Sequence, residues 1–284
     1  MNSTPGFSNT KSGSGSMKYS LCTLLVTVFA LSGCSTGGSS QLGDDYSQVY
    51  AETEGVQRRA LVIGMTAVDP GSYGGWDGAC PGADVDADVV SQLCLDQGLQ
   101  LVTYYNQEAT WARTKAAALA ATKGMRPGDL FVIFIAGHGG QKRDYGGDEA
   151  DGYDETLLLW DGEITDDQLL NLWESMPKGV RVLYITDTCN SGTNYRSRRD
   201  YRRTIPRDFR GALVHIGGCS DGESSFGSAQ GGIMTTALID AWEEGIGLWQ
   251  WYIAMVKRMP EKQAPIWAEF GNVDAEFRLG AALQ

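Results

Sequence analysis

The chain has 284 residues, 42% of them hydrophobic, and a net charge of −12. So large an excess of negative charge argues against a nucleic-acid-binding protein, because phosphate binding needs lysine and arginine. The six cysteines include no CxxC pair and are accompanied by only two histidines. This composition also argues against a structural zinc site.

The first 45 residues are predicted to lie outside the folded domain. An apolar run covers residues 21–31, which is too short to span a bilayer and has the length of a signal segment. It ends in Leu31-Ser32-Gly33-Cys34, which resembles the lipobox of bacterial lipoproteins. The resemblance implies that Cys34 carries a lipid, that residues 35–45 form a flexible tether, and that the protein is anchored in the bacterial cell envelope, facing the periplasm or the surface. An uncleaved hydrophobic anchor or a disordered tail is the alternative.

Residues 46–284 are predicted to form one α/β domain, because strand and helix patterns alternate along them. The expected strands cover residues 59–65, 99–105, 129–136, 180–187, 212–217 and 263–269, with a short extended piece at 155–160. The expected helices cover residues 84–97, 109–123, 166–176, 232–244 and 249–259. A long loop is expected from His138 to about residue 154. The alternation predicts a mostly parallel sheet with helices on both faces.

Two reactive side chains follow two of these strands. His138 comes just after the strand at 129–136, and Cys189 just after the strand at 180–187. The carboxyl ends of parallel strands meet at one edge of a sheet, where ligands bind. A thiolate is a strong nucleophile, and a nearby imidazole both activates it and transfers protons.

Each residue also has a plainer interpretation. An unpaired cysteine is most often a small core residue, and a loop histidine is often held by ordinary hydrogen bonds. Against this, Cys189 follows its strand, and the glycines around His138 allow close approach of a substrate and leave N–H groups free for an oxyanion. His215 is a rival base, but it lies within an expected strand, which favours a core role. Cys80 and Cys94 are candidates for a disulfide in an oxidising compartment.

Several motifs together resemble the caspase-like fold, and metacaspases in particular. The strongest are FVIFIAGHGGQ at 131–141 and DTCNSG at 187–192, and the spacing of His138 and Cys189 also fits caspases. Further similar segments are ALVIG at 60–64, GADVDA at 82–87, DGYDE at 151–155, ITDDQ at 164–168 and GGCSDGESS at 217–225. The resemblance implies a caspase-like three-layer sandwich around a mostly parallel six-stranded sheet.

The same resemblance implies a cysteine endopeptidase that cuts after arginine or lysine. Cys189 would attack the scissile carbonyl, His138 would transfer protons, and the N–H groups of Gly139 and Cys189 would bind the oxyanion. Asp86 and Asp187 match the acids that bind the basic side chain in this family, and carboxylates suit that task. Their alternative roles are a helix-start acid and a strand-end turn acid. Ala136 and Asn190 depart from the residues that metacaspases usually carry there, serine and histidine.

Three further expectations come from the resemblance. A calcium site is implied at Asp154, Asp166 and Asp167, although these acids also suit a solvated loop and a helix N-terminus. Residues 195–210 hold seven arginines where this family cuts itself, which implies self-processing. The resemblance also implies a monomer that acts on basic proteins or peptides, and an inactive caspase-like module that binds basic peptides at the membrane is the alternative.

Overall fold

The computed structural model describes residues 46–143, 152–189, 194, 209–219 and 225–284. The predicted lipid attachment at Cys34, the whole of the tether and most of the arginine-rich loop therefore lie outside the described residues.

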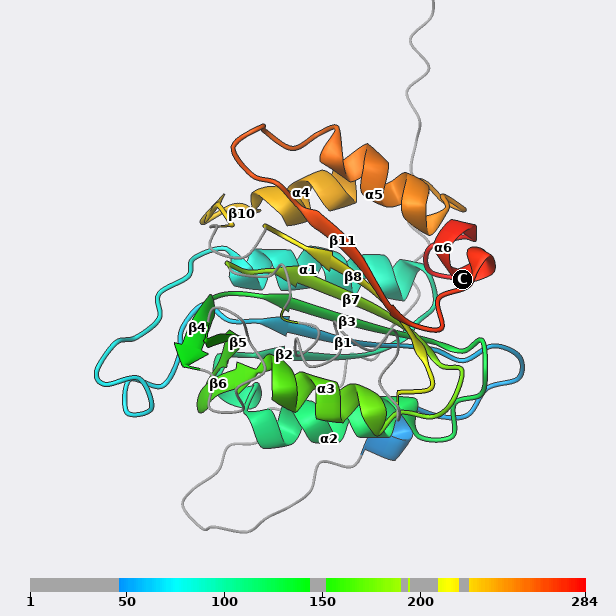
Figure 1. The fold of residues 1–284 in the computed structure, drawn as a ribbon, viewed down its shortest axis with the longest axis horizontal. Coiled ribbons are helices and arrows are strands. Elements are labelled where there is room, and N and C mark those ends of the chain that lie inside the picture. The colour runs from blue at the N-terminus through cyan, green and yellow to red at the C-terminus, as the bar shows by residue number, and fades with distance from the viewer. Residues whose placement is uncertain (1–45, 144–151, 190–193, 195–208, 220–224) are drawn as a thin grey trace, which may run out of the picture. The chain divides into compact units, whose positions relative to one another are not determined.

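A six-stranded sheet forms the centre of the domain, in the order β11-β8-β7-β3-β1-β2. Its first three strands along the chain are β1 (Arg58–Gly64), β2 (Gln100–Tyr105) and β3 (Leu130–Ala136). The others are β7 (Arg181–Asp187), β8 (Ala212–Gly217) and β11 (Ile266–Gly271). All neighbours pair in parallel except β11, which runs antiparallel to β8 at one edge (Figure 1). The predicted mostly parallel six-stranded sheet is confirmed.

Helices cover both faces of this sheet, which gives the predicted three layers (Figure 1). One face carries α1 (Ala83–Asp96), α4 (Ile233–Asp240) and α5 (Leu248–Val256), with α6 (Ala275–Leu279) beside them. The other face carries α2 (Trp111–Thr122) and α3 (Asp166–Glu174). Short 3₁₀ turns occur at Tyr46–Gln48 and Asn106–Glu108. Because both faces are covered, the inner strands are continuously apolar, and β3 is buried at every position.

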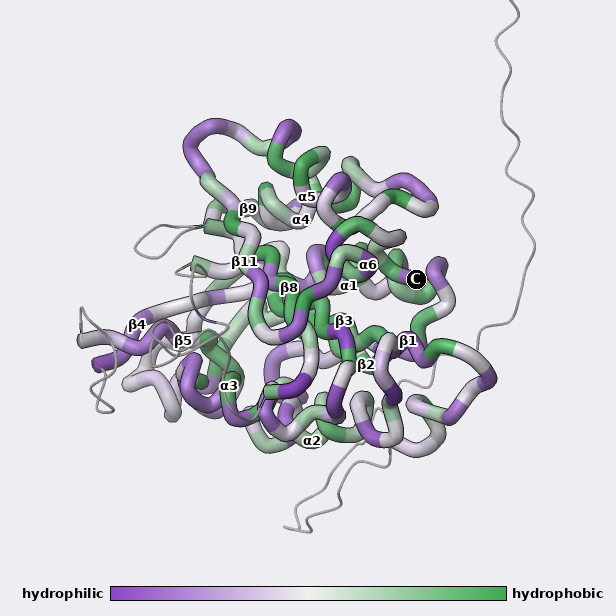
Figure 2. The backbone as a smooth tube through the Cα atoms, turned by 45° about the vertical axis from the view of Figure 1, so that its right-hand side comes forward, coloured by the Kyte–Doolittle hydropathy of each residue, from purple (hydrophilic) through white to green (hydrophobic). Residues whose placement is uncertain are grey.

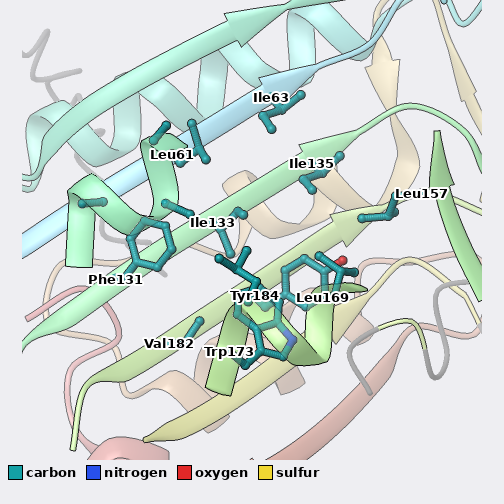
Figure 3. Packing of buried hydrophobic residues seen from close by; sticks show 14 of the residues in the cluster. Leu61, Ile63, Phe131, Ile133, Ile135, Leu157, Leu169, Trp173, Val182 and Tyr184 are labelled. Carbon is teal, nitrogen blue, oxygen red and sulfur yellow. The ribbon is translucent and has the colours of Figure 1, made fainter. Parts of the chain in front are cut away.

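The core is correspondingly divided into two clusters by the sheet. Figure 3 shows the cluster beneath α3, where Trp173 packs against Tyr184 of β7 with ring centroids 5.4 Å apart. The second cluster lies between the sheet and helices α1, α4 and α5. Figure 2 shows that hydrophobic positions concentrate in the inner strands, while the connecting loops are more hydrophilic.

A small antiparallel sheet follows His138 and was only partly predicted. It consists of β4 (Gly139–Arg143), β5 (Tyr153–Leu159) and β6 (Gly162–Thr165). The expectation of a loop directly after His138 was wrong, because Gly-Gly-Gln-Lys-Arg has no strand pattern and becomes a strand only by pairing with β5. The two-residue strands β9 (Gly227–Ser228) and β10 (Gly231–Gly232), and helix α6, were also not predicted.

Candidate active site

The central sheet brings the histidine and cysteine segments to the same edge. Ala136 and Asp187 are partners in the register of β3 and β7, and the Gly137 N–H donates to the Asp187 carbonyl at 3.3 Å. His138 and Cys189 each follow two residues after this pair. The expected convergence of the two strand ends is therefore present.

Contact between the two segments continues beyond the strands. A Cβ atom added to Gly139 would lie 1.9 Å from the carbonyl oxygen of Cys189 and 3.2 Å from Oγ1 of Thr188. No residue with a side chain fits at that distance, so the absence of a Cβ lets the backbone beside His138 rest against the backbone of Cys189. The two residues expected to supply oxyanion N–H groups, Gly139 and Cys189, are thus adjacent in space.

The imidazole of His138 is held by the loop that precedes α1. Its Nε2 lies 3.3 Å from the carbonyl oxygen of Ala79, and its ring centroid lies 5.0 Å from that of Trp76. When Nε2 carries the proton and donates a hydrogen bond to this carbonyl, the imidazole is in the tautomer that leaves Nδ1 as the basic nitrogen. The ring is only partly buried, so it remains accessible to a substrate.

The thiol of Cys189 is also partly buried and points toward the Ser225 carbonyl, 3.9 Å from the sulfur. The preceding residue, Thr188, is buried, and its carbonyl accepts from the Cys219 thiol at 3.5 Å. The side chain of Cys189 is therefore partly exposed, while the backbone just before it is held in the core by the buried Thr188 and the Cys219 thiol. Such a position suits a nucleophile better than a core cysteine.

Asp86 and Asp187 lie together next to this edge of the sheet, although 101 positions (187 − 86) separate them in the sequence. Both Asp86 carboxylate oxygens accept from the Gly232 N–H, at 2.8 and 2.9 Å. A Cβ on Gly232 would lie 2.1 Å from Asp187 Oδ2 and 3.0 Å from Asp86 Oδ2. The two carboxylates thus converge on the backbone of one glycine.

Burial raises the pKa values of both acids, and for Asp86 repulsion from Asp187 adds to this. Burial, and after it the charge of Asp187, raise the pKa of Asp86 to about 7, against the opposing effect of the Gly232 N–H. Burial also raises the pKa of Asp187, against the hydrogen bonds of Ser225 and Thr235. The Cys80 thiol lies in the same field, and burial followed by the charges of Asp187 and Asp86 raises its pKa to about 11. A cation entering this region would relieve the repulsion and favour two ionised carboxylates.

The alternative structural roles of the two acids are present as well. Asp86 lies in the first turn of α1, and Asp187 ends β7. Asp187 Oδ2 accepts from the Thr235 N–H at 3.0 Å and from its hydroxyl at 2.7 Å, within the first turn of α4. Carboxylates stabilise a helix N-terminus, so the pair also fixes α4.

Three polar residues that complete this region were not predicted from the sequence. Besides Thr235, the Ser225 hydroxyl donates to Asp187 Oδ1 in a short hydrogen bond. The buried amide of Gln263 donates to the Gly218 carbonyl at 2.8 Å and to the Ser225 hydroxyl at 2.9 Å, and its oxygen accepts from the Phe226 N–H. A single polar residue beside a loop gives no periodic signal, and of these three residues only Ser225 lies in one of the motifs that resemble metacaspases.

The residues expected to bind calcium are near one another in the fold. Asp166 and Asp167 follow β6, whose last residue, Thr165, pairs with Thr156, two positions after Asp154 on β5. Carboxylates suit calcium. Even so, within the described ranges no three His, Cys, Asp or Glu side chains form a group that could hold a metal ion. Calcium binding by these three acids therefore stays a prediction.

The remaining candidates have structural roles. His215 is completely buried in β8, stacks on Tyr184 at 4.6 Å and shares a 2.9 Å hydrogen bond with Thr186; burial lowers its pKa to about 3. It is therefore a neutral core residue. The suggested disulfide is wrong, since Cys80 and Cys94 are both free. Cys80 precedes α1 and Cys94 lies near its end, so most of a helix of about 20 Å separates them.

Within the described part of the chain, no helix is both long and apolar enough to cross a membrane.

Comparison with known proteins identifies the same family that the sequence motifs resemble. Residues 57–269 match the family model described as caspase domain. The chain is 33% identical over 158 residues to metacaspase-1 of Mycosarcoma maydis, covering 51% of this chain and 38% of that protein. It is 36% identical over 150 residues to metacaspase-2 of Arabidopsis thaliana, covering 43% of this chain and 36% of that protein. It thus spans well under half the length of these curated relatives.

A solved structure resembles almost the whole domain. The crystal structure of protein GSU0716 from Geobacter sulfurreducens matches with a TM-score of 0.71 and 32% sequence identity. The match covers 80% of this chain and 98% of that one. The fold is therefore shared over nearly the whole of that solved chain.

Proposed function

We propose that this chain, which belongs to the caspase-domain family, is a cysteine endopeptidase that cuts peptide bonds after arginine or lysine. The observation that carries the proposal is the convergence of β3 and β7, which places Gly139 against Cys189 directly beside His138. Similarity to metacaspases supports the same activity.

The proposed reaction has two stages. The Cys189 sulfur attacks the carbonyl carbon of the scissile bond while the thiol proton passes to His138, and the oxyanion is bound by the N–H groups of Gly139 and Cys189. His138 then protonates the leaving amine, and the C–N bond breaks to give a thioester on Cys189. Water, deprotonated by His138, attacks this thioester and releases the new carboxyl terminus and the free thiol.

The preference for a basic residue is proposed from the acid pair. Asp86 and Asp187 are both buried, converge on Gly232 and have raised pKa values, so their carboxylates gain most when a guanidinium or ammonium group enters. An acidic residue before the scissile bond would instead add a third negative charge.

The direct test is hydrolysis of fluorogenic peptides that end in Arg, Lys or Asp. We expect cleavage after Arg and Lys alone, and a loss on the order of a thousandfold or more in Cys189→Ala and His138→Ala. Cys94→Ala is the matched control, because it removes a free thiol that lies buried in the core away from the site. A wild-type protein that is folded yet hydrolyses none of these peptides would contradict the proposal.

A second candidate is an inactive module that binds basic peptides. It is favoured by the same acid pair, which would attract a basic side chain whether or not the bond is cut. Binding of Arg-containing peptides that leaves them intact in the wild type, and that weakens in Asp86→Asn, would support this alternative.

Calcium activation is proposed from the family resemblance and from the proximity of Asp154, Asp166 and Asp167. Peptide hydrolysis is measured with calcium and after chelation, in the wild type and in Asp154→Asn. Calcium stimulation that the variant lacks would support the site. A rate that chelation leaves unchanged would remove calcium from the proposal.

Self-processing is proposed for residues 195–210, because their arginines fit the proposed specificity. Purified wild type should yield two fragments whose new termini follow arginines of this segment, and Cys189→Ala should stay intact. An active enzyme that remains a single chain would contradict it.

Attachment to the cell envelope through a lipid on Cys34 is proposed from the lipobox resemblance alone. Mass spectrometry of the cellular protein should show an acylated N-terminal Cys34 and no residues before it. The monomeric state is likewise proposed from the family, and light scattering of the purified protein tests it.

A further inference from the structure

An exposed indole lies against the imidazole of the proposed catalytic histidine. The ring centroids of Trp76 and His138 are 5.0 Å apart, with the ring planes at 52°, and 46% of the Trp76 surface is exposed. A single exposed aromatic side chain needs no explanation by itself. This one touches the group proposed to protonate the leaving amine, so it has exposed apolar surface beside the reacting groups.

The loop that carries Trp76 is fixed at several points. The Tyr73 ring packs on Trp76 at 6.1 Å, and its hydroxyl donates to the Leu159 carbonyl at 2.7 Å. The Val68 N–H donates to the Asp77 carbonyl at 2.8 Å, and the Asp69 N–H to the Trp160 carbonyl at 3.1 Å. Trp76 is thus presented on a braced loop, as a preformed binding surface requires.

The same loop decides which side of the imidazole meets the substrate. With the Nε2–H donated to the Ala79 carbonyl, Nδ1 is the nitrogen that would take part in proton transfer. The leaving amine must come within about 3 Å of that nitrogen. An imidazole ring is small, so the residue that carries the leaving amine has its side chain within reach of the indole.

We propose that Trp76 forms the apolar wall of the subsite for the substrate residue that follows the scissile bond. The inference rests on the proposed peptidase function and adds a second determinant of specificity to the acid pair. The chemistry of the subsite favours an aromatic or aliphatic side chain, which covers the exposed indole, over glycine or aspartate.

Quenched fluorescent peptides with Arg before the bond and Phe, Leu, Gly or Asp after it test this subsite. We expect the wild type to cleave the Phe and Leu peptides with about fivefold higher kcat/KM than the Gly peptide. In Trp76→Ala this ratio falls to about one, while Trp76→Phe retains most of it. Leu95→Ala is the control, because it removes a similarly exposed apolar side chain, 44% accessible, from the far end of α1.

Two results would overturn the inference. An equal fall in kcat for all four peptides in Trp76→Ala would mean that the indole only positions His138. If the kcat values and the ratio of the Phe and Leu peptides to the Gly peptide all stay unchanged, the indole neither positions His138 nor binds the substrate. A binding measurement keeps the test separate from the proposed activity. In the Cys189→Ala background, fluorescence anisotropy should show tighter binding of the Phe peptide than of the Gly peptide, and Trp76→Ala should abolish the difference. If the wild type cleaves no peptide, the peptidase proposal fails while the binding measurement still decides the subsite.

Discussion

Gly139 lies so close to Cys189 that a Cβ atom at position 139 would be 1.9 Å from the Cys189 carbonyl oxygen. The next glycine is less constrained, because a Cβ on Gly140 would meet only side-chain atoms, the nearest being Thr156 Oγ1 at 3.1 Å. The two glycines are neighbours in sequence and in β4, yet only at the first one would a Cβ meet the backbone of the proposed nucleophile.

Gly139→Ala is therefore expected to reduce hydrolysis of an Arg peptide by on the order of a hundredfold, because either the Cys189 backbone or β4 must move. Gly140→Ala is the matched substitution and should cost less than about tenfold. Both kcat/KM values are compared at equal folded fraction, judged by circular dichroism. Equal losses in the two variants would show that close packing at Gly139 is not what places Cys189.

Most of the sheet was predictable because strands such as Leu130–Ala136 are apolar over their whole length. The two reactive residues were predictable for a related reason: each follows such a strand at a glycine or a small polar residue. Strand β4 was not predictable, because its residues acquire strand geometry only from the partner strand β5. The two-residue strands Gly227–Ser228 and Gly231–Gly232 were not predictable for the same reason, because they are strands only through pairing with each other.

The acid pair shows a different limit. Position along the motif suggested Asp86 and Asp187 together, and the structure brings them together at Gly232. That Asp187 also holds the first turn of α4 through Thr235 could not be predicted, since this contact links positions 48 residues apart with no pattern between them.

The pKa of Asp86 predicts how substrate affinity depends on pH. Burial and the charge of Asp187 raise this pKa from 3.8 to about 7, so Asp86 is largely protonated in weak acid and ionised in weak base. Only the ionised form attracts an arginine strongly. The KM for an Arg peptide should therefore fall severalfold as the pH rises from about 6 to about 8. In Asp86→Asn the KM should be high and nearly constant across this range, and a pH dependence that persists in the variant would assign the titration to another group.

The same shift predicts an effect on folding stability with a defined sign. An acid whose pKa is raised by folding stabilises the folded state below its unfolded pKa, and this contribution is lost as the pH rises toward the folded value. From about pH 5 to about pH 8, Asp86 should thus lower the free energy of unfolding by on the order of 2 kcal/mol. Urea denaturation of wild type and Asp86→Asn at both pH values isolates this effect. The difference between the two proteins should shift in favour of the variant at the higher pH, and the absence of any shift would mean that Asp86 is ionised throughout this range.

Thr235 offers a test of whether the acid pair is held by α4. Its hydroxyl and its N–H both bond to Asp187 Oδ2, at 2.7 and 3.0 Å, and the residue is completely buried. Thr235→Val keeps the shape and the N–H but removes the hydroxyl, which leaves a buried carboxylate oxygen with one donor fewer. The free energy of unfolding should fall by about 1–3 kcal/mol, and the KM for Arg peptides should change because Asp187 is no longer fixed.

Thr236→Val is the control, since this neighbouring threonine is exposed and should tolerate the change within about 0.5 kcal/mol. If both variants unfold at the same urea concentration as the wild type, the hydroxyl of Thr235 does not secure Asp187, and the acid pair must be positioned by Ser225 and the backbone of α4 alone.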